Sequence, residues 1–208
     1  TGGMLNFRPL YYINGVRNAQ ISPLDRGLAY GDGVFETMAM EGGRIRLLDW
    51  HLLRLKDACQ TLSIPLSETA LLAQLEQTLA SASAAAIEMA TIKIVVTRGE
   101  GGRGYVMPSK CVPTLCTIVN PAADYPVDNT QNGISLFACK QTLGRNSSLA
   151  GLKHLNKLEY VLARNEWHDD TYAEGLLCDD RGNVIEGTFS NIFFVRNQSL
   201  LTPRLSRC

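Results

Sequence analysis

The sequence predicts a mixed α/β (α+β) fold arranged in two domains. Three observations predict this class: β-branched segments typical of strands, apolar stripes with helical spacing, and a polar segment with two prolines between two such regions. The chain has 208 residues, of which 45% are hydrophobic and 19% charged, so it can bury a full core. We expect a domain over residues 4–120, a linker over 121–133 and a second domain over 134–208.

The first domain is expected to begin with strands. Residues 11–16 form an expected strand that an Asn-Gly turn interrupts, and residues 34–47 form a hairpin closed by two glycines. The three residues before Met4 are typical of a tag remnant, so Met4 is the expected native start.

Two amphipathic helices are expected next. Asp49 is expected to cap the first, whose apolar residues recur four and three positions apart: Leu48, Leu52, Leu55, Cys59 and Leu62. Pro65 ends this helix and Ser67 starts the next, which carries leucines along one face. Strands over 92–97 and 114–119 complete the domain.

The second domain is expected to begin with a strand over residues 134–139. A helix is expected from Lys153 through His168, because a glycine loop precedes an apolar pattern with helical spacing. Turn-forming residues then separate three short strands, at residues 173–178, 184–188 and 191–195.

Charge and cysteine content exclude several classes of function. Lysine and arginine together number 20, as do aspartate and glutamate, so there is no basic surface for nucleic acid and no polybasic membrane signal. No apolar stretch is long enough to span a bilayer, and no leader is evident. The six cysteines form no Cys-x-x-Cys pair, so we expect no metal site and reduced thiols in a cytoplasmic protein.

Lys153 is the most informative residue, and Glu186 lies on a later expected strand. A lysine fixed at the end of an element and a lone acid suit an enzyme of pyridoxal 5'-phosphate (PLP). The lysine forms a Schiff base with the cofactor, and the acid keeps the pyridine nitrogen protonated. Each residue also has an ordinary interpretation: a solvated surface charge for Lys153, and an exposed acid closing a hairpin for Glu186.

Other polar residues fit the same chemistry. Arg54 lies off the apolar stripe of its helix. It is either an ordinary surface charge, or its guanidinium donates two N–H groups to a phosphate. Thr188, Ser190 and Asn191 either cap the chain locally or bond the cofactor's phosphate and ring substituents.

Three arginines in glycine-containing loops suit a substrate with carboxylates, although loop charges are the ordinary interpretation: Arg98, Arg103 and Arg145. Tyr30 and Tyr105 are either core and rim aromatics or ligand contacts. We treat Tyr30, Arg103, Tyr105, Arg145 and His154 as candidates for substrate binding.

Four segments, in order, resemble the class IV (fold type IV) PLP enzymes: residues 30–37, 51–55, 153–156 and 186–193. That group holds branched-chain aminotransferases, D-amino acid aminotransferases and 4-amino-4-deoxychorismate lyase. The resemblance covers nearly the whole chain after Met4. Two further segments are similar to the lyase: residues 98–105, and residues 143–146 followed shortly by residues 150–159.

The resemblance implies a fold with PLP between two domains, in a homodimer. It implies that Lys153 is the Schiff-base lysine and the general acid and base, that Arg54 binds the phosphate, and that Glu186 pairs with the pyridine nitrogen. The implied reaction converts 4-amino-4-deoxychorismate to 4-aminobenzoate and pyruvate, in folate synthesis. Two alternatives stay open: a D-amino acid or branched-chain aminotransferase, and an inactive fragment with a structural or binding role.

The end of the chain departs from the resemblance. The family continues past the position of Cys208 with a glycine-rich segment whose backbone amides hold the phosphate, and then with the rest of the second domain. We therefore expect a truncated C-terminal domain with an incomplete site.

Overall fold

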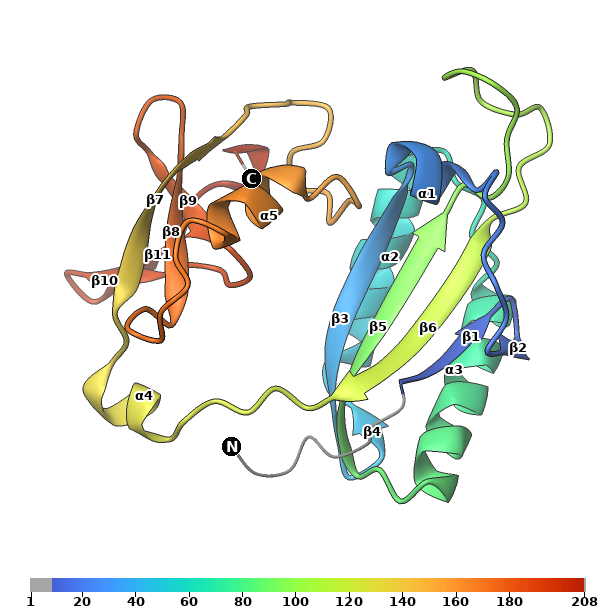
Figure 1. The fold of residues 1–208 in the computed structure, drawn as a ribbon, viewed down its shortest axis with the longest axis horizontal. Coiled ribbons are helices and arrows are strands. Elements are labelled where there is room, and N and C mark those ends of the chain that lie inside the picture. The colour runs from blue at the N-terminus through green and yellow to red at the C-terminus, as the bar shows by residue number, and fades with distance from the viewer. Residues whose placement is uncertain (1–8, 208) are drawn as a thin grey trace. The chain divides into compact units, whose positions relative to one another are not determined.

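The computed structural model describes residues 9–207, which divide into two compact units (Figure 1). Unit 1 comprises Thr1–Asp124 together with Lys153–Leu155, and unit 2 comprises Tyr125–Leu152 and Asn156–Cys208. Met4, the predicted start, and Cys208 lie outside the described residues. Lys153 therefore belongs to unit 1, whereas the sequence analysis assigned it to the second domain.

Unit 1 is built on an antiparallel sheet of six strands in the order β2-β1-β6-β5-β3-β4. Alternate residues along the central strand, Ile92, Ile94 and Val96, are fully buried, as the period of two in a strand requires. The strands are β1 (Leu10–Ile13), β2 (Val16–Arg17), β3 (Gly33–Glu41), β4 (Arg44–Ile45), β5 (Met89–Thr97) and β6 (Thr114–Pro121). The predicted strands of the first domain are thus confirmed, except that the hairpin ends at Ile45 and does not continue to residue 47.

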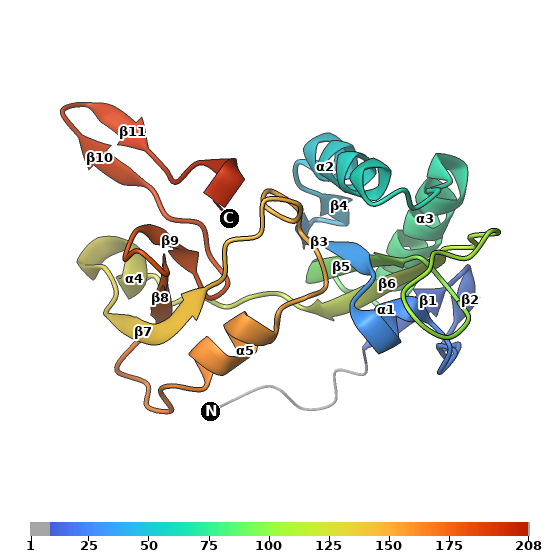
Figure 2. The same ribbon diagram turned by 90° about the horizontal axis from the view of Figure 1, so that it is seen from above.

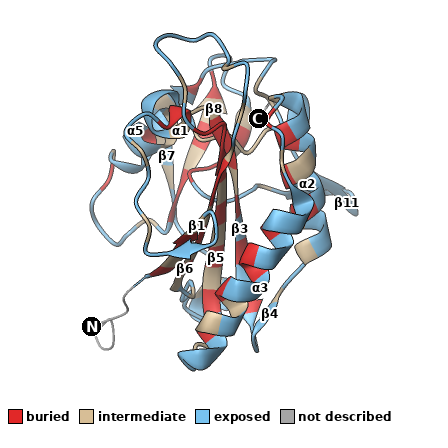
Figure 3. Ribbon diagram, turned by 90° about the vertical axis from the view of Figure 1, so that its right-hand side faces the viewer, coloured by how far each residue is buried: buried red, intermediate tan, exposed pale blue. Residues whose placement is uncertain are grey.

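Two helices pack against this sheet: α2 (Leu48–Thr61) on β3, and α3 (Glu68–Ala84) on β1 and β6. Figure 2 shows both helices on one face of the sheet, and Figure 3 marks the buried residues along them. Ser67 caps α3 by accepting a hydrogen bond from the amide of Ala70, as predicted. The predicted Asp49 cap is wrong, because α2 starts after Leu47, whose backbone is left-handed (φ 52°) and whose side chain offers no cap.

A buried amide joins α3 to the sheet and to the β1–β2 turn. The Gln74 side chain accepts from the Gly15 amide at 2.7 Å and donates to the Leu115 carbonyl and the Thr117 hydroxyl, each at 3.2 Å. Gln74 thus satisfies polar groups that would otherwise be buried without partners.

Unit 2 has a smaller sheet in the order β7-β8-β9 and a separate hairpin of β10 and β11. Strands β7 and β8 are parallel, and β8 and β9 are antiparallel. Its core is formed by Leu143, Ala163, Leu177 and Ile185. The elements are α4 (Asp128–Asn132), β7 (Leu136–Leu143), α5 (Leu158–Arg164), β8 (Glu174–Asp179), β9 (Val184–Gly187), β10 (Phe194–Arg196), β11 (Ser199–Leu201) and a 3₁₀ turn (Leu205–Arg207).

The segment around Lys153 differs from the prediction. The expected helix from Lys153 through His168 is confined to α5, and residues 153–155 instead extend the edge of β3. The Phe35 amide donates to the Lys153 carbonyl at 2.9 Å, and the Leu155 amide donates to the Gly33 carbonyl at 3.0 Å. This edge is open because β4 pairs only with the far end of β3.

The cysteines and the helices bear on two predictions, that of reduced thiols and that of no membrane span. The five described cysteines are free thiols, and burial raises the pKa of Cys59 to about 11, so that this thiol stays protonated at neutral pH. Among residues 9–207, none of the helices combines the length and the apolar character needed to cross a bilayer.

Replacing Gln74 by alanine is expected to lower the free energy of unfolding by about 2–3 kcal/mol, because several buried groups lose their partners at once. Urea unfolding followed by circular dichroism measures the change. Gln77→Ala is the matched control on the exposed face of α3 and is expected to have almost no effect. Equal effects of the two substitutions would contradict this account of the buried amide.

Candidate active site

Lys153 is held on the edge of β3 and not on a free loop. The isolated bridge between Val34 and His154 places Lys153 beside Phe35. The Lys153 ammonium lies 4.7 Å from the centre of the Phe35 ring. Side chains of directly paired residues share one face of a sheet, so the half-buried lysine is fixed in direction by the pairing. His154, a predicted substrate residue, points to the other face by the same alternation.

Glu36 follows Phe35 on β3, and its carboxylate is the centre of a buried cluster under α2. The Glu36 side chain is only 1% exposed. Arg54 forms a fork on it, with Nε donating to Oε1 and Nη2 to Oε2, each at 2.6 Å. His51 Nδ1 lies 2.7 Å from Oε2. The hydrogen bonds that Arg54 donates to Glu36 raise the pKa of its guanidinium above its usual value and outweigh the effect of burial.

Sequence analysis identified Arg54 but neither Glu36 nor His51. A signal was present, since Glu36 is a lone acid at a buried position of an apolar strand, and such an acid needs a cationic partner. His51 and Arg54 are three residues apart on α2, a spacing that puts them on one face of the helix.

Arg98, considered above as a substrate residue, is instead buried in unit 1. Its Nε and Nη2 donate to the two carboxylate oxygens of Asp32 at 2.8 and 3.0 Å, and it also donates to the carbonyls of Leu62 and Ser63. Arg26 donates to Asp32 at 2.8 Å as well. Burial raises the pKa of Asp32, but the hydrogen bonds from Arg98 and Arg26 outweigh it and lower the pKa below 3.8.

Arg26 also fixes the loop between β5 and β6. Its guanidinium donates to the carbonyls of Gly104, Tyr105 and Val106 at 3.1–3.4 Å. The Tyr105 side chain itself is 84% exposed and meets the Tyr30 ring edge-on at 5.3 Å. The two predicted tyrosines therefore lie together, and Arg103 is exposed on the same loop.

In unit 2, Glu186 lies half-buried on β9 and accepts a short hydrogen bond from the Tyr160 hydroxyl on α5. The Lys157 ammonium lies 4.1 Å from the centre of the Tyr160 ring. Tyr160 was not identified from the sequence, because no local pattern links it to an acid 26 residues later.

A second acid of unit 2, Glu174, organises the turn after β9. Its buried carboxylate accepts from the Thr188 amide at 2.9 Å and the Thr188 hydroxyl at 2.5 Å. The Ser190 hydroxyl also donates to it, and the Phe189 amide does so at 3.3 Å. Both hydroxyls predicted to bind the cofactor thus donate to Glu174, and Asn191 is exposed.

Arg145 forms an ion pair within unit 2. Its Nε and Nη2 donate to Asp180 at 2.9 and 3.4 Å. The fork that was predicted to bind a substrate carboxylate therefore already holds a protein carboxylate at the surface.

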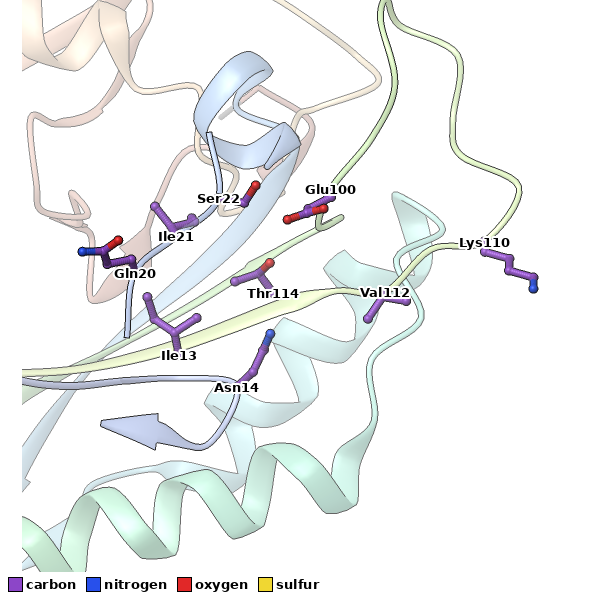
Figure 4. A pocket seen from close by; sticks show the side chains of 9 residues that line it. All are labelled: Ile13, Asn14, Gln20, Ile21, Ser22, Glu100, Lys110, Val112 and Thr114. Atoms are coloured by element: carbon purple, nitrogen blue, oxygen red, sulfur yellow. The ribbon is translucent and has the colours of Figure 1, made fainter. Parts of the chain in front are cut away.

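A hollow of about 460 Å³ lies elsewhere in unit 1, beside the end of β1 and the β5–β6 loop (Figure 4). None of its lining residues is a predicted site residue. Asn14 accepts from the Leu115 amide, and Thr114 donates to the buried Asp25, so these polar groups serve the fold. Lys110 points away from the hollow.

These elements define a fold type IV protein of mixed α/β structure. The family model of class IV aminotransferases matches residues 33–208, and the chain belongs to this family. The match includes β3 with Glu36, helix α2 with Arg54, the segment of Lys153 and the turn after Glu186.

Members with lyase and transferase names are both similar to the chain. An aminodeoxychorismate lyase of Vibrio harveyi is 33% identical over 201 residues, which cover 94% of this chain and 71% of that protein. A Methanocaldococcus jannaschii protein, provisionally named a branched-chain-amino-acid aminotransferase, is 36% identical over 200 residues, 92% of this chain and 67% of that protein. The crystal structure of 4-amino-4-deoxychorismate lyase from Pseudomonas aeruginosa superposes with a TM-score of 0.87 at 46% identity, covering 96% of this chain and 72% of that one.

The lowered pKa of Asp32 makes unit 1 sensitive to acid. Because this carboxylate is stabilised when ionised, its contribution is present above its ordinary value of 3.8 and is lost as the pH falls through the lower value of the folded state. We expect Asp32→Asn to lower the unfolding free energy by about 3 kcal/mol at pH 7 and by less in acid. Denaturant titrations between pH 7 and pH 2 measure both.

The exposed Asp57 on α2 is the matched control, and Asp57→Asn is expected to leave the acid dependence unchanged. A wild-type protein and an Asp32→Asn variant with parallel acid profiles would disprove the assignment.

Proposed function

We propose that this protein is a PLP-dependent lyase that converts 4-amino-4-deoxychorismate to 4-aminobenzoate and pyruvate. The observation that carries the proposal is the placement of Lys153 on the edge of β3, in the same compact unit as Arg54. The 46% identity to a crystallised 4-amino-4-deoxychorismate lyase supports the choice of reaction within the family. A homodimer in the cytoplasm is part of this proposal from resemblance alone.

The donor set present in the chain fits PLP. Lys153 offers an amine for the cofactor aldehyde, Arg54 a cation for the phosphate, and Glu186 a carboxylate for the pyridine nitrogen. Tyr160 restrains the direction of that carboxylate through its hydrogen bond. When bound, PLP supplies an electron sink for the carbon that bears the substrate amine. Thr188, Ser190 and Asn191 stay proposed ligands, since a hydroxyl that donates to Glu174 keeps lone pairs to accept with.

Lys153 is the proposed proton carrier of the reaction. Its Nζ takes the proton from the amine-bearing carbon of the substrate and later returns a proton to the departing pyruvate fragment. Hydrogen bonds of its own carbonyl and of the Leu155 amide to β3 hold the lysine where one amine serves both steps. Loss of the enolpyruvyl group makes the substrate ring aromatic, which drives the reaction forward.

The substrate carboxylates need cationic partners. Arg103 is the more accessible candidate, because it is exposed and carries no ion pair among residues 9–207. Arg145 must leave Asp180 before it can bind a carboxylate. Tyr30, Tyr105 and His154 stay proposed contacts.

Lys153→Ala is expected to abolish the absorbance of PLP covalently linked to the protein and to lower turnover by about 10²–10⁴-fold or more, since the linking amine and proton carrier is lost. The measurement is an absorbance scan before and after borohydride reduction, with peptide mapping of the reduced adduct onto Lys153. Lys140→Ala, at an exposed position, is the control. A Lys153→Ala protein that keeps both absorbance and turnover would refute the assignment.

An aminotransferase is the second candidate, favoured by the 36% identity to the Methanocaldococcus jannaschii protein. Release of pyruvate from 4-amino-4-deoxychorismate without any added keto acid is expected for the lyase. Amino transfer from a D- or branched-chain amino acid, strictly dependent on a keto acid and without that release, would favour the transferase. A coupled lactate dehydrogenase assay and chromatography of amino acids distinguish the two.

A further inference from the structure

The cluster under α2 contains more binding capacity than Arg54 alone. Glu36 is a fully buried carboxylate, and an unpaired carboxylate at such a position is costly. Arg54 neutralises the Glu36 carboxylate with two hydrogen bonds, one of them to Oε2, and His51 contacts the same oxygen. Glu36 therefore fixes the orientation of two side chains that are one helical turn apart.

Both side chains keep a nitrogen that the carboxylate does not use. Glu36 occupies Nε and Nη2 of Arg54, and it occupies Nδ1 of His51. Within residues 9–207, the structure gives neither Nη1 of Arg54 nor Nε2 of His51 a hydrogen-bond partner. The Arg54 side chain is 49% exposed and that of His51 is 19% exposed, so a ligand has access to both.

The chemistry of these two nitrogens matches a phosphate monoester. A guanidinium presents rigid N–H donors that fit phosphate oxygens, and a histidine that donates from Nδ1 to a carboxylate also donates from Nε2, in a fixed direction, when its ring is protonated. The Glu36 carboxylate balances the charge of the Arg54 guanidinium in the free protein. The two side chains can still complement an incoming dianion.

We infer that His51 is a second ligand beside Arg54 in one anion-binding site for a phosphate monoester, and that the buried Glu36 orients both. That the phosphate is the one carried by PLP rests on the proposed function. The competing explanation is that the three residues only clamp α2 to the sheet.

Two substitutions of His51 separate ligand from clamp. In His51→Asn, the side-chain amide replaces Nδ1 and keeps the bond to Glu36, but nothing replaces Nε2. In His51→Gln, the longer amide reaches the position of Nε2. Dissociation constants are measured by fluorescence titration with PLP, with unphosphorylated pyridoxal and with inorganic phosphate.

The preference of the wild-type protein for PLP over pyridoxal is expected to fall about tenfold or more in His51→Asn, and to be largely retained in His51→Gln. Phosphate affinity is expected to follow the same order. His168→Asn changes an exposed histidine of unit 2 and serves as the control. Unfolding midpoints are recorded for every variant.

If His51→Asn folds normally and keeps the full preference for PLP, the clamp explanation holds and the inference is overturned. Borohydride mapping separates this result from the fate of the proposed function. If PLP is fixed to Lys153 but His51 has no role in binding it, the proposed function is supported and the inference about His51 is overturned. Phosphate binding that depends on His51 in a protein that never links PLP would support the anion site and overturn the function.

Discussion

The pairing of residues 153–155 with β3 is the constraint on which the site of unit 1 depends. Two backbone hydrogen bonds bring a segment more than a hundred positions away in sequence to the open edge of the sheet. The pairing requires Gly33, because a Cβ there would come within 2.5 Å of the Val96 carbonyl and 2.8 Å of the Leu155 side chain. Without that glycine, neither the edge nor the lysine could keep its place.

The two faces of strand β3 contact different residues of the site. Phe35 faces the Lys153 ammonium, while its neighbour Glu36 points under α2 to Arg54 and His51. Phe35 and Glu36 face opposite sides because successive side chains of a strand alternate between its two faces. A lysine and an arginine that are far apart in sequence are thereby tied to adjacent residues of one strand.

Local patterns predicted the elements of the fold well and their contacts poorly. The alternation of Ile92, Ile94 and Val96 and the cap at Ser67 depend on neighbours in sequence, so the sequence alone was enough. The extended conformation at Lys153 depends on an edge formed by distant residues, which an apolar pattern cannot reveal. The same limit applies to the site, where Lys153, Arg54 and Glu186 carried a chemical signature, but Tyr160 and Glu174 act only through partners brought near by folding.

The hydrogen bonds from Arg26 to the β5–β6 loop affect which substitutions the loop can accept during evolution. Arg26 holds the loop by three main-chain oxygens and by no side chain of residues 104–106. An anchor of this kind does not depend on which side chains the loop carries. Residues such as Tyr105 and Val106 can therefore be replaced while the backbone of the loop keeps its path. The side chains on the surface of the loop can thus change without a change in the fold of unit 1.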